Sequence, residues 1–164
     1  MMYYSASMNT LDESLMNAVK EGKLLESSRT NIRLLLDGTE SPIAREAVEE
    51  LAAAGEWQEL NDRFYKTLAF GTGGLRGRTI GSIVTRSEQG NGVVNGRPEY
   101  PCVGTACMNY FNVGRAMRGL IIYVNKHVEA TDPGRKPRLV IGHDTRHFSR
   151  DFAEFCAKIG TDLG

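Results

Sequence analysis

Apolar residues recur at intervals of three and four positions through the first 70 residues, which predicts a helical N-terminal segment. Thr10 and Glu13 have the spacing of a capping box, so the first helix is expected to begin there. Its core face would consist of Leu11, Leu15, Met16 and Val19. Such stripes are typical of packing surfaces rather than of cofactor sites.

Two more helices are predicted before residue 70. The first spans residues 41–55, with Ser41 as N-cap, Pro42 at the first helical position and Gly55 at its end. The second lies within residues 56–70, and its apolar face carries Trp57, Leu60 and Phe64.

Helical spacing returns after Asn112, the expected N-cap of a helix that ends near residues 129–137. Its apolar positions are Val113, Ala116, Met117, Leu120, Ile121, Val124 and Val128. The continuous apolar run 139–141 then predicts a buried parallel strand, and residues 81–86 a short strand. Ser149 should cap a last helix that ends at Gly160, with Phe152, Phe155, Cys156 and Ile159 pointing inward.

This order of elements predicts an α/β fold, with a mixed or parallel sheet and flanking helices, preceded by a helical extension. We expect the extension to span residues 1–56 and the α/β domain residues 57–164. A helix that follows a parallel strand normally leads to a further strand, in a unit of about 30 residues or more. None follows Gly160, so the sequence is expected to be a fragment of a longer protein.

Composition limits the classes of function. The chain has 164 residues, of which 20 are basic and 20 acidic, and this balance argues against a broad nucleic-acid-binding surface. No apolar segment approaches the roughly 20 residues that span a bilayer, and no signal peptide is apparent. The three cysteines, Cys102, Cys107 and Cys156, are interpreted as reduced thiols of a cytoplasmic protein.

The stretch FGTGGLRGRTIG, residues 70–81, combines five glycines with Arg76 and Arg78. Glycines allow backbone N–H groups to approach a ligand and form an anion-binding nest. Thr72 adds a hydroxyl, and the guanidinium of Arg76 matches two phosphate oxygens. The segment fits neither the P-loop nor the dinucleotide fingerprint. A tight turn with solvent-exposed arginines is the alternative.

A second polar loop, GHDTRHFS at residues 142–149, follows the predicted strand directly. Asp144 and Arg146 are placed either to contact a ligand at the end of that strand or to pair and pin the loop. His143 and His147 lie in a loop, so their spacing does not indicate a metal site. No serine stands in a nucleophile elbow.

Together, FGTGGLRG at 70–77 and VIGHDTRHFSRDFA at 140–153 resemble the α-D-phosphohexomutase superfamily, in particular its phosphoglucomutase and phosphomannomutase branch. The resemblance covers about residues 57–160, and the preceding helices resemble the extension of larger members. It implies an isomerase that moves a phosphoryl group between the 1 and 6 positions of a sugar phosphate. A phosphoserine, Mg²⁺ held by three aspartates and a glucose 1,6-bisphosphate intermediate take part.

Carried onto this sequence, the resemblance gives Arg76 the catalytic place, facing the phosphoserine and the transferring phosphate. Thr72, Gly73 and Gly74 would form the same phosphate-binding wall, while Asp144 and Arg146 would support the second loop. The phosphoserine loop, the D-G-D-G-D-R metal loop and the sugar-recognition loop are absent, and residues 86–108 are interpreted as an insertion. The chain alone is therefore expected to be inactive. A non-enzymatic phosphometabolite-binding module and a helical interaction protein are the alternative functions.

Overall fold

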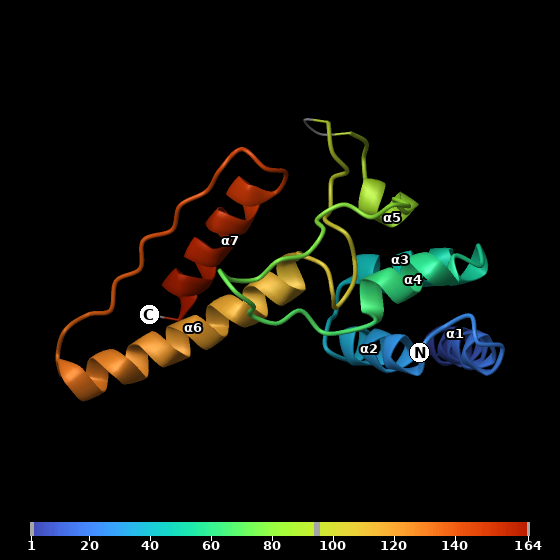
Figure 1. Cartoon of the computed structure of the whole chain (residues 1–164), viewed down its shortest axis with the longest axis horizontal. Helices are drawn as coiled ribbons and strands as arrows, with labels where there is room; N and C mark the ends of the chain where they lie inside the picture. The colour runs from blue at the N-terminus through green and yellow to red at the C-terminus, as the bar shows by residue number, and fades with distance from the viewer. Residues whose placement is uncertain (1, 94–95, 164) are drawn as a thin grey trace. The chain divides into compact units, whose positions relative to one another are not determined.

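The computed structural model describes residues 2–93 and 96–163, and 55% of it is helical (Figure 1). It divides into two compact units, Met1–Met108 and Asn109–Gly164, each of which is considered by itself. The first unit holds α1 Met2–Lys20, α2 Glu26–Asp37, α3 Pro42–Ala53, α4 Trp57–Phe64 and α5 Arg86–Gln89. The second holds α6 Tyr110–Thr131 and α7 Ser149–Asp162.

The predicted α/β fold is wrong. The described residues form no sheet, and Gly71 and Gly74 are joined only by an isolated bridge. Neither residues 81–86 nor residues 139–141 have a neighbouring strand, and a strand without a partner leaves its backbone groups unpaired. Short apolar runs are compatible with several environments. Residues 81–85 and 139–141 are irregular chain, and Arg86 already belongs to α5.

The first unit is built on α1 to α4, which lie together in Figure 1. α2 packs against α1, α3 and α4, and α3 also packs against α5. The helices predicted from Ser41 and from Trp57 are confirmed as α3 and α4. Leu60 and Phe64 of α4 are completely buried, as their spacing predicted. The wider core of the unit comes from apolar side chains of all four helices, among them Leu15, Ile32, Leu35, Val48 and Leu51.

Two local predictions in this unit are wrong. Helix α1 begins at Met2, so Thr10 lies inside the helix and does not cap it. Leu11 and Leu15 are buried as expected, but Met16 is 39% exposed because the buried stripe passes through Ala18 instead. The capping box that does form is at α5, where the Thr85 side chain accepts from the Glu88 N–H and Glu88 reaches back to the Thr85 N–H.

In the second unit, α6 and α7 pack side by side (Figure 1). The cap of α6 is Asn109 rather than Asn112, because the Asn109 side chain accepts the N–H of Asn112 at 3.1 Å. Met117, Ile121 and Ile159 form the buried centre, against which Phe155 and Cys156 pack. Leu120, a predicted core position of α6, is 45% exposed.

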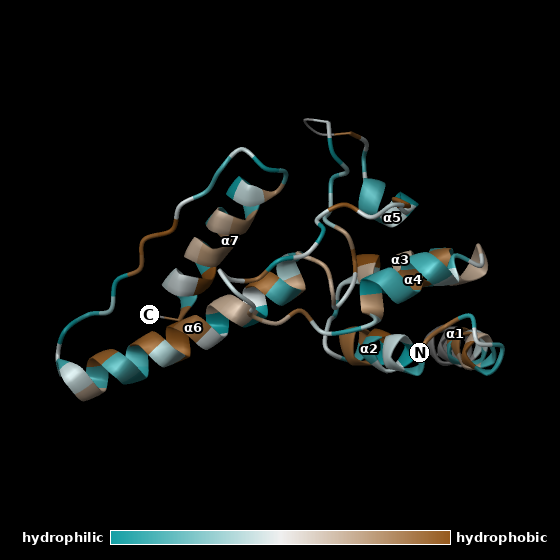
Figure 2. Ribbon diagram, viewed as in Figure 1, coloured by the Kyte–Doolittle hydropathy of each residue, from teal (hydrophilic) through white to brown (hydrophobic). Residues whose placement is uncertain are grey.

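The segment between α6 and α7 runs back toward the start of α7 (Figure 1). Its apolar run stands out in Figure 2, but it is not a buried strand. Leu139 and Ile141 line a pocket on the helices, while the intervening Val140 is fully exposed. Neighbouring side chains of this run therefore lie in different environments, and a continuous apolar sequence does not indicate this difference.

Helix α7 differs from its prediction at both ends. Ser149 is its first residue, and the N-cap is Phe148 in the left-handed conformation, with φ of 64°. Gly160 does not end α7, which continues to Asp162. Phe148 is buried and stacks on Phe152, and this packing holds it in a conformation that non-glycine residues seldom adopt.

Candidate anion-binding cleft

The glycine-rich loop forms a tight turn. Gly71 and Gly74 exchange two backbone hydrogen bonds of 3.2 Å each, and Gly73 and Gly74 have φ of 80° and 113°. These dihedrals explain why glycine occupies both positions. Within the described part of the chain, the turn's hydrogen bonds leave the N–H groups of Thr72 and Gly73 without a backbone acceptor. Thr72 and Gly73 are both exposed, so these donors are open to a ligand.

Arg76 lies over this turn and lines a cleft of about 690 Å³. A Cβ atom added at Gly73 would come within 2.9 Å of Arg76 Nη2, so the glycine leaves room for the guanidinium. No carboxylate among the described residues forms an ion pair with Arg76. The structure thus brings Thr72, Gly73, Gly74 and Arg76 together, with the cation accessible.

The opposite side of the cleft comes from the α1–α2 connection and from α4. Asn61 of α4 fixes that connection through both ends of its amide group. Its Nδ2 donates to the Lys23 carbonyl, and its Oδ1 accepts from the Leu25 N–H, each at 2.9 Å. The cleft also includes Gln58, Asp62, Tyr65, Lys66 and Arg78.

Arg78, the second arginine of the motif, has a structural role. Its guanidinium bonds Glu59 at 3.3 Å, Asp62 at 3.2 Å and the Ser82 hydroxyl at 3.0 Å. Burial alone would lower the pKa of Arg78, but the charge of Glu59 and the hydrogen bond to Asp62 outweigh it and raise that pKa. Arg78 therefore ties the glycine-rich loop to α4.

Behind the cleft lies a buried ionic network that no sequence motif predicts. Arg63 of α4 is completely buried and bonds Glu59 at 2.8 Å and Glu88 at 2.5 Å. Arg63 also donates to the carbonyls of Ile83 and Val103, and Glu88 accepts the Val103 N–H. Only the four-residue spacing of Glu59 and Arg63 hinted at it. The network anchors the irregular segment after the glycine-rich loop to α4.

Two thiols pack within the same segment. The Sγ atoms of Cys102 and Cys107 are 3.1 Å apart, both residues are buried, and none of the three cysteines is in a disulfide. The hydrogen bond between the thiols, together with burial, raises the pKa of Cys102 far above its usual range. Cys102 is therefore a neutral thiol. Cys156, interpreted as a core residue, is only partly buried.

Asp144 and Arg146 belong to the other unit and pair with each other. Arg146 donates to Asp144 through Nε at 2.8 Å and through its backbone N–H at 3.0 Å. The Ser149 hydroxyl accepts the Asp144 N–H at 3.1 Å, which closes the loop onto the start of α7. This is the pinning arrangement that the sequence left open beside a direct ligand role, and both side chains remain exposed.

This pairing predicts a pH dependence. The hydrogen bonds from Arg146 lower the pKa of Asp144 to about 2. Because the folded-state pKa is depressed, the pairing contributes fully above the ordinary carboxyl pKa of about 4 and is lost as pH falls toward 2. A ¹³C NMR titration of Asp144 should therefore have its midpoint near pH 2. Arg146→Ala should raise this midpoint toward the ordinary value of about 4 without reaching it, because the backbone N–H of residue 146 still donates to the carboxylate. Equal midpoints in the two proteins would contradict the pairing in solution.

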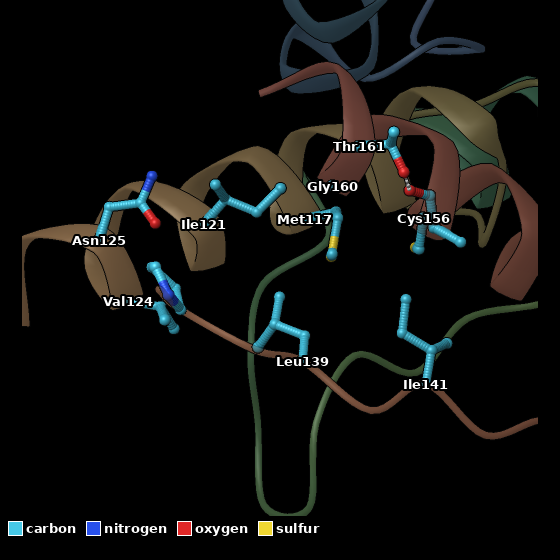
Figure 3. Close-up of a pocket in the computed structure, with 11 residues that line it drawn as sticks. Met117, Ile121, Val124, Asn125, Leu139, Ile141, Cys156, Gly160 and Thr161 are labelled. Atoms are coloured by element: carbon cyan, nitrogen blue, oxygen red, sulfur yellow. Dashed lines mark hydrogen bonds between the residues drawn. The ribbon is translucent and has the colours of Figure 1, made fainter. Parts of the chain in front are cut away.

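The second unit has an apolar pocket of about 320 Å³ between α6, α7 and the connecting segment (Figure 3). Leu139 and Ile141 face Met117 of α6 and Cys156 of α7 across it. The pocket offers no cationic side chain. Its lining is mostly apolar, and it is open to the surface at Leu139 and Ile141, which are 42% and 39% exposed, so it does not suit a phosphorylated ligand.

No group of three or more His, Cys, Asp or Glu side chains gathers around a common point in the described ranges. The Mg²⁺ implied by the family resemblance therefore finds no ligand set among them. No helix of the described chain is both long and apolar enough to cross a bilayer. No family model, curated protein or solved structure matches the chain.

Proposed function

We propose that the chain is the N-terminal portion of a phosphoglucomutase-like enzyme that interconverts sugar 1-phosphates and sugar 6-phosphates. One observation carries the proposal: Arg76 stands over a glycine turn with open N–H groups, lines a cleft and has no carboxylate partner among the described residues. A turn with a purely structural role would not require an unpaired arginine beside open backbone N–H groups. The two sequence motifs supply the reaction class.

In this role Arg76 binds a phosphoryl group rather than performing proton transfer. Its guanidinium donates two parallel hydrogen bonds to phosphoryl oxygens, and the N–H groups of Thr72 and Gly73 donate to the same group. Such contacts neutralise and orient the charge, which is most of what catalysis of phosphoryl transfer requires of a protein. The phosphoryl-carrying serine is expected from a segment outside this sequence. Mg²⁺, when bound in such an enzyme, would neutralise part of the phosphate charge.

The binding step can be tested by titrating the ¹⁵N-labelled chain with glucose 1-phosphate. We expect the amide signals of Thr72 and Gly73 to shift, and Arg76→Ala to weaken binding about tenfold, the loss of about 1.4 kcal/mol. Arg118→Ala is the matched control, since Arg118 is an exposed arginine of α6 that lies in neither sequence motif. Unmoved loop amides, or equal effects of the two variants, would count against the proposal and favour a helical interaction protein.

The enzyme is distinguished from a non-enzymatic binding module by the messenger RNA. An open reading frame that continues past Gly164 into a T-A-S-H-N-P-like segment supports the mutase. A stop codon at this position supports a module that only binds phosphorylated metabolites. In a coupled assay with glucose 1-phosphate, the 164-residue chain should show no turnover because none of its residues carries a phosphoryl group in the proposed mechanism.

A further inference from the structure

We propose that Cys102 and Cys107 are a site of reversible oxidation, and that the disulfide formed between them changes how the glycine-rich loop of residues 70–81 is held. The reactant would be a low-molecular-weight disulfide such as oxidised glutathione. The inference is independent of the ligand proposed for Arg76, because it concerns only the thiols of the chain and the backbone that they support.

The fold holds the two thiols in contact. Their Sγ atoms are 3.1 Å apart, and a disulfide bond is about 2.05 Å long, so the sulfurs need to approach by only about 1 Å. The chain between them turns at Gly104, whose carbonyl accepts the Cys107 N–H at 3.4 Å. A Cβ atom at Gly104 would lie 2.9 Å from Cys107 Sγ, so the glycine leaves room for that sulfur. Because folding has already brought the thiols together, bond formation requires no further loop closure.

Burial determines how fast this pair reacts. Both side chains are buried, and the hydrogen bond to Cys107 together with burial raises the pKa of Cys102, which is therefore a neutral thiol. The attacking species in thiol–disulfide exchange is the thiolate, so the folded chain should react slowly. The loop of residues 102–107 is irregular and can open locally while the helices stay folded. We expect oxidation within minutes to hours, and faster oxidation at higher pH.

The chemistry is a thiol–disulfide exchange in two steps. One cysteine, as its thiolate, attacks a sulfur of oxidised glutathione, forms a mixed disulfide and releases the first glutathione. The other cysteine loses its proton and attacks the protein sulfur of the mixed disulfide, which releases the second glutathione. The dithiol loses two electrons and two protons, and these convert one oxidised glutathione into two glutathione thiols. An excess of dithiothreitol reverses the reaction.

The loop of residues 102–107 holds the chain that leads into the glycine-rich loop. Thr105, at its centre, is completely buried. Its hydroxyl donates to the Lys66 carbonyl at 2.8 Å, and its own carbonyl accepts the Leu68 N–H at 2.7 Å. A change in the shape of the 102–107 loop therefore reaches the start of the glycine-rich loop directly.

The second half of the glycine-rich loop is held from the same place. The Cys102 N–H donates to the Thr79 carbonyl at 2.8 Å, and the Met108 N–H donates to the Arg78 carbonyl at 2.9 Å. One of these donors belongs to a cysteine of the pair, and the other follows Cys107 directly. The two ends of the glycine-rich loop are thus fastened to a segment whose ends a disulfide would draw together.

The test uses the ¹⁵N-labelled chain with Cys156→Ser, which removes the third, partly buried thiol. After incubation with an excess of oxidised glutathione, the intact mass should fall by two hydrogen atoms, with no glutathione attached. The amide signals of Leu68 and Thr79 should shift and should return with dithiothreitol. Cys107→Ala in the same background should gain at most one glutathione. The chain without any cysteine, in which Cys102 and Cys107 are alanine, should show no shift of Leu68 or Thr79.

Three results would overturn the proposal. The first is a folded chain that keeps both thiols, or keeps a mixed disulfide, under conditions in which the urea-unfolded chain forms the Cys102–Cys107 bond. The second is a disulfide that forms while the amide signals of Leu68 and Thr79 stay in place. The third is an oxidised chain whose Trp57 fluorescence is that of the unfolded state, since the bond would then be incompatible with the Met1–Met108 unit. None of these results bears on the proposed function, because no phosphate compound is present.

Discussion

Arg63→Met should lower the free energy of unfolding of the Met1–Met108 unit by about 3–5 kcal/mol. Methionine is similar in length, so the loss would come from charge rather than from volume. The substitution leaves Glu88, which is 1% exposed, without its cation, and it leaves Glu59, which is 4% exposed, with Arg78 alone. It also removes the donors to the carbonyls of Ile83 and Val103. Buried carboxylates without a partner are far more costly than an exposed ion pair that is lost.

The chain contains a matched control for this experiment. Arg33 of α2 pairs with Asp12 at 2.7 Å, as closely as Arg63 pairs with Glu59, but its side chain is 51% exposed. Arg33→Met should therefore cost no more than about 1 kcal/mol. Trp57, the single tryptophan, begins α4, so its fluorescence in a urea titration reports on this unit. Similar losses of unfolding free energy in Arg63→Met and Arg33→Met would show that burial does not increase the contribution of the network to stability.

Arg63→Lys provides a second measurement if the methionine variant does not fold. Lysine keeps the charge but cannot reach Glu59, Glu88 and the Ile83 carbonyl at once with one ammonium group. It should therefore recover only part of the stability. Full recovery would indicate that net charge alone, without the geometry of the guanidinium, holds the network together.

Local sequence patterns predicted the helices better than anything else in the chain. Pro42 with Gly55, and the stripe of Leu60 and Phe64, located α3 and α4, because capping and periodicity act within one helix. The Arg63 network was not predictable in this way. Glu88 is 25 residues from Arg63 in sequence, and only the folded chain brings them together.

The candidate anion site shows the same limit. The sequence located the glycine turn and the family resemblance singled out Arg76, but the pattern of residues gave Arg78, two positions away, no role of its own. In the folded chain the two arginines differ in their partners, because Glu59 and Asp62 of α4 pair with Arg78 and not with Arg76.

The failed prediction of a sheet has a different cause. The run 139–141 was interpreted as a strand because three apolar residues in succession suggest burial on both sides. In the folded chain Val140 is fully exposed, while Leu139 and Ile141 lie against helices. Hydrophobicity indicates that burying a side chain is favourable in free energy. It does not indicate that the backbone pairs with a neighbouring strand.

Gly104→Ala should destabilise the Met1–Met108 unit by as much as about 3 kcal/mol, through a collision rather than a lost interaction. A Cβ atom at this position would lie 2.6 Å from the Arg63 carbonyl oxygen and 2.9 Å from both Arg63 Cβ and Cys107 Sγ. That carbonyl also accepts the Ala106 N–H at 2.9 Å, so the loop cannot retreat without losing this bond.

Gly119→Ala is the control for Gly104→Ala, because the same change should have the opposite sign there. Gly119 lies within α6, and a Cβ atom would meet nothing within 4 Å. Alanine should stabilise the helix by about 0.5–1 kcal/mol, since glycine loses more backbone freedom on folding. In a urea titration, the Trp57 fluorescence transition should move to lower urea in Gly104→Ala and should not move in Gly119→Ala. The gain in stability of Gly119→Ala should appear instead in the unfolding of helix followed by circular dichroism. An unchanged Trp57 transition in Gly104→Ala would mean that the loop of residues 102–107 does not pack on α4 in solution as tightly as its hydrogen bonds require.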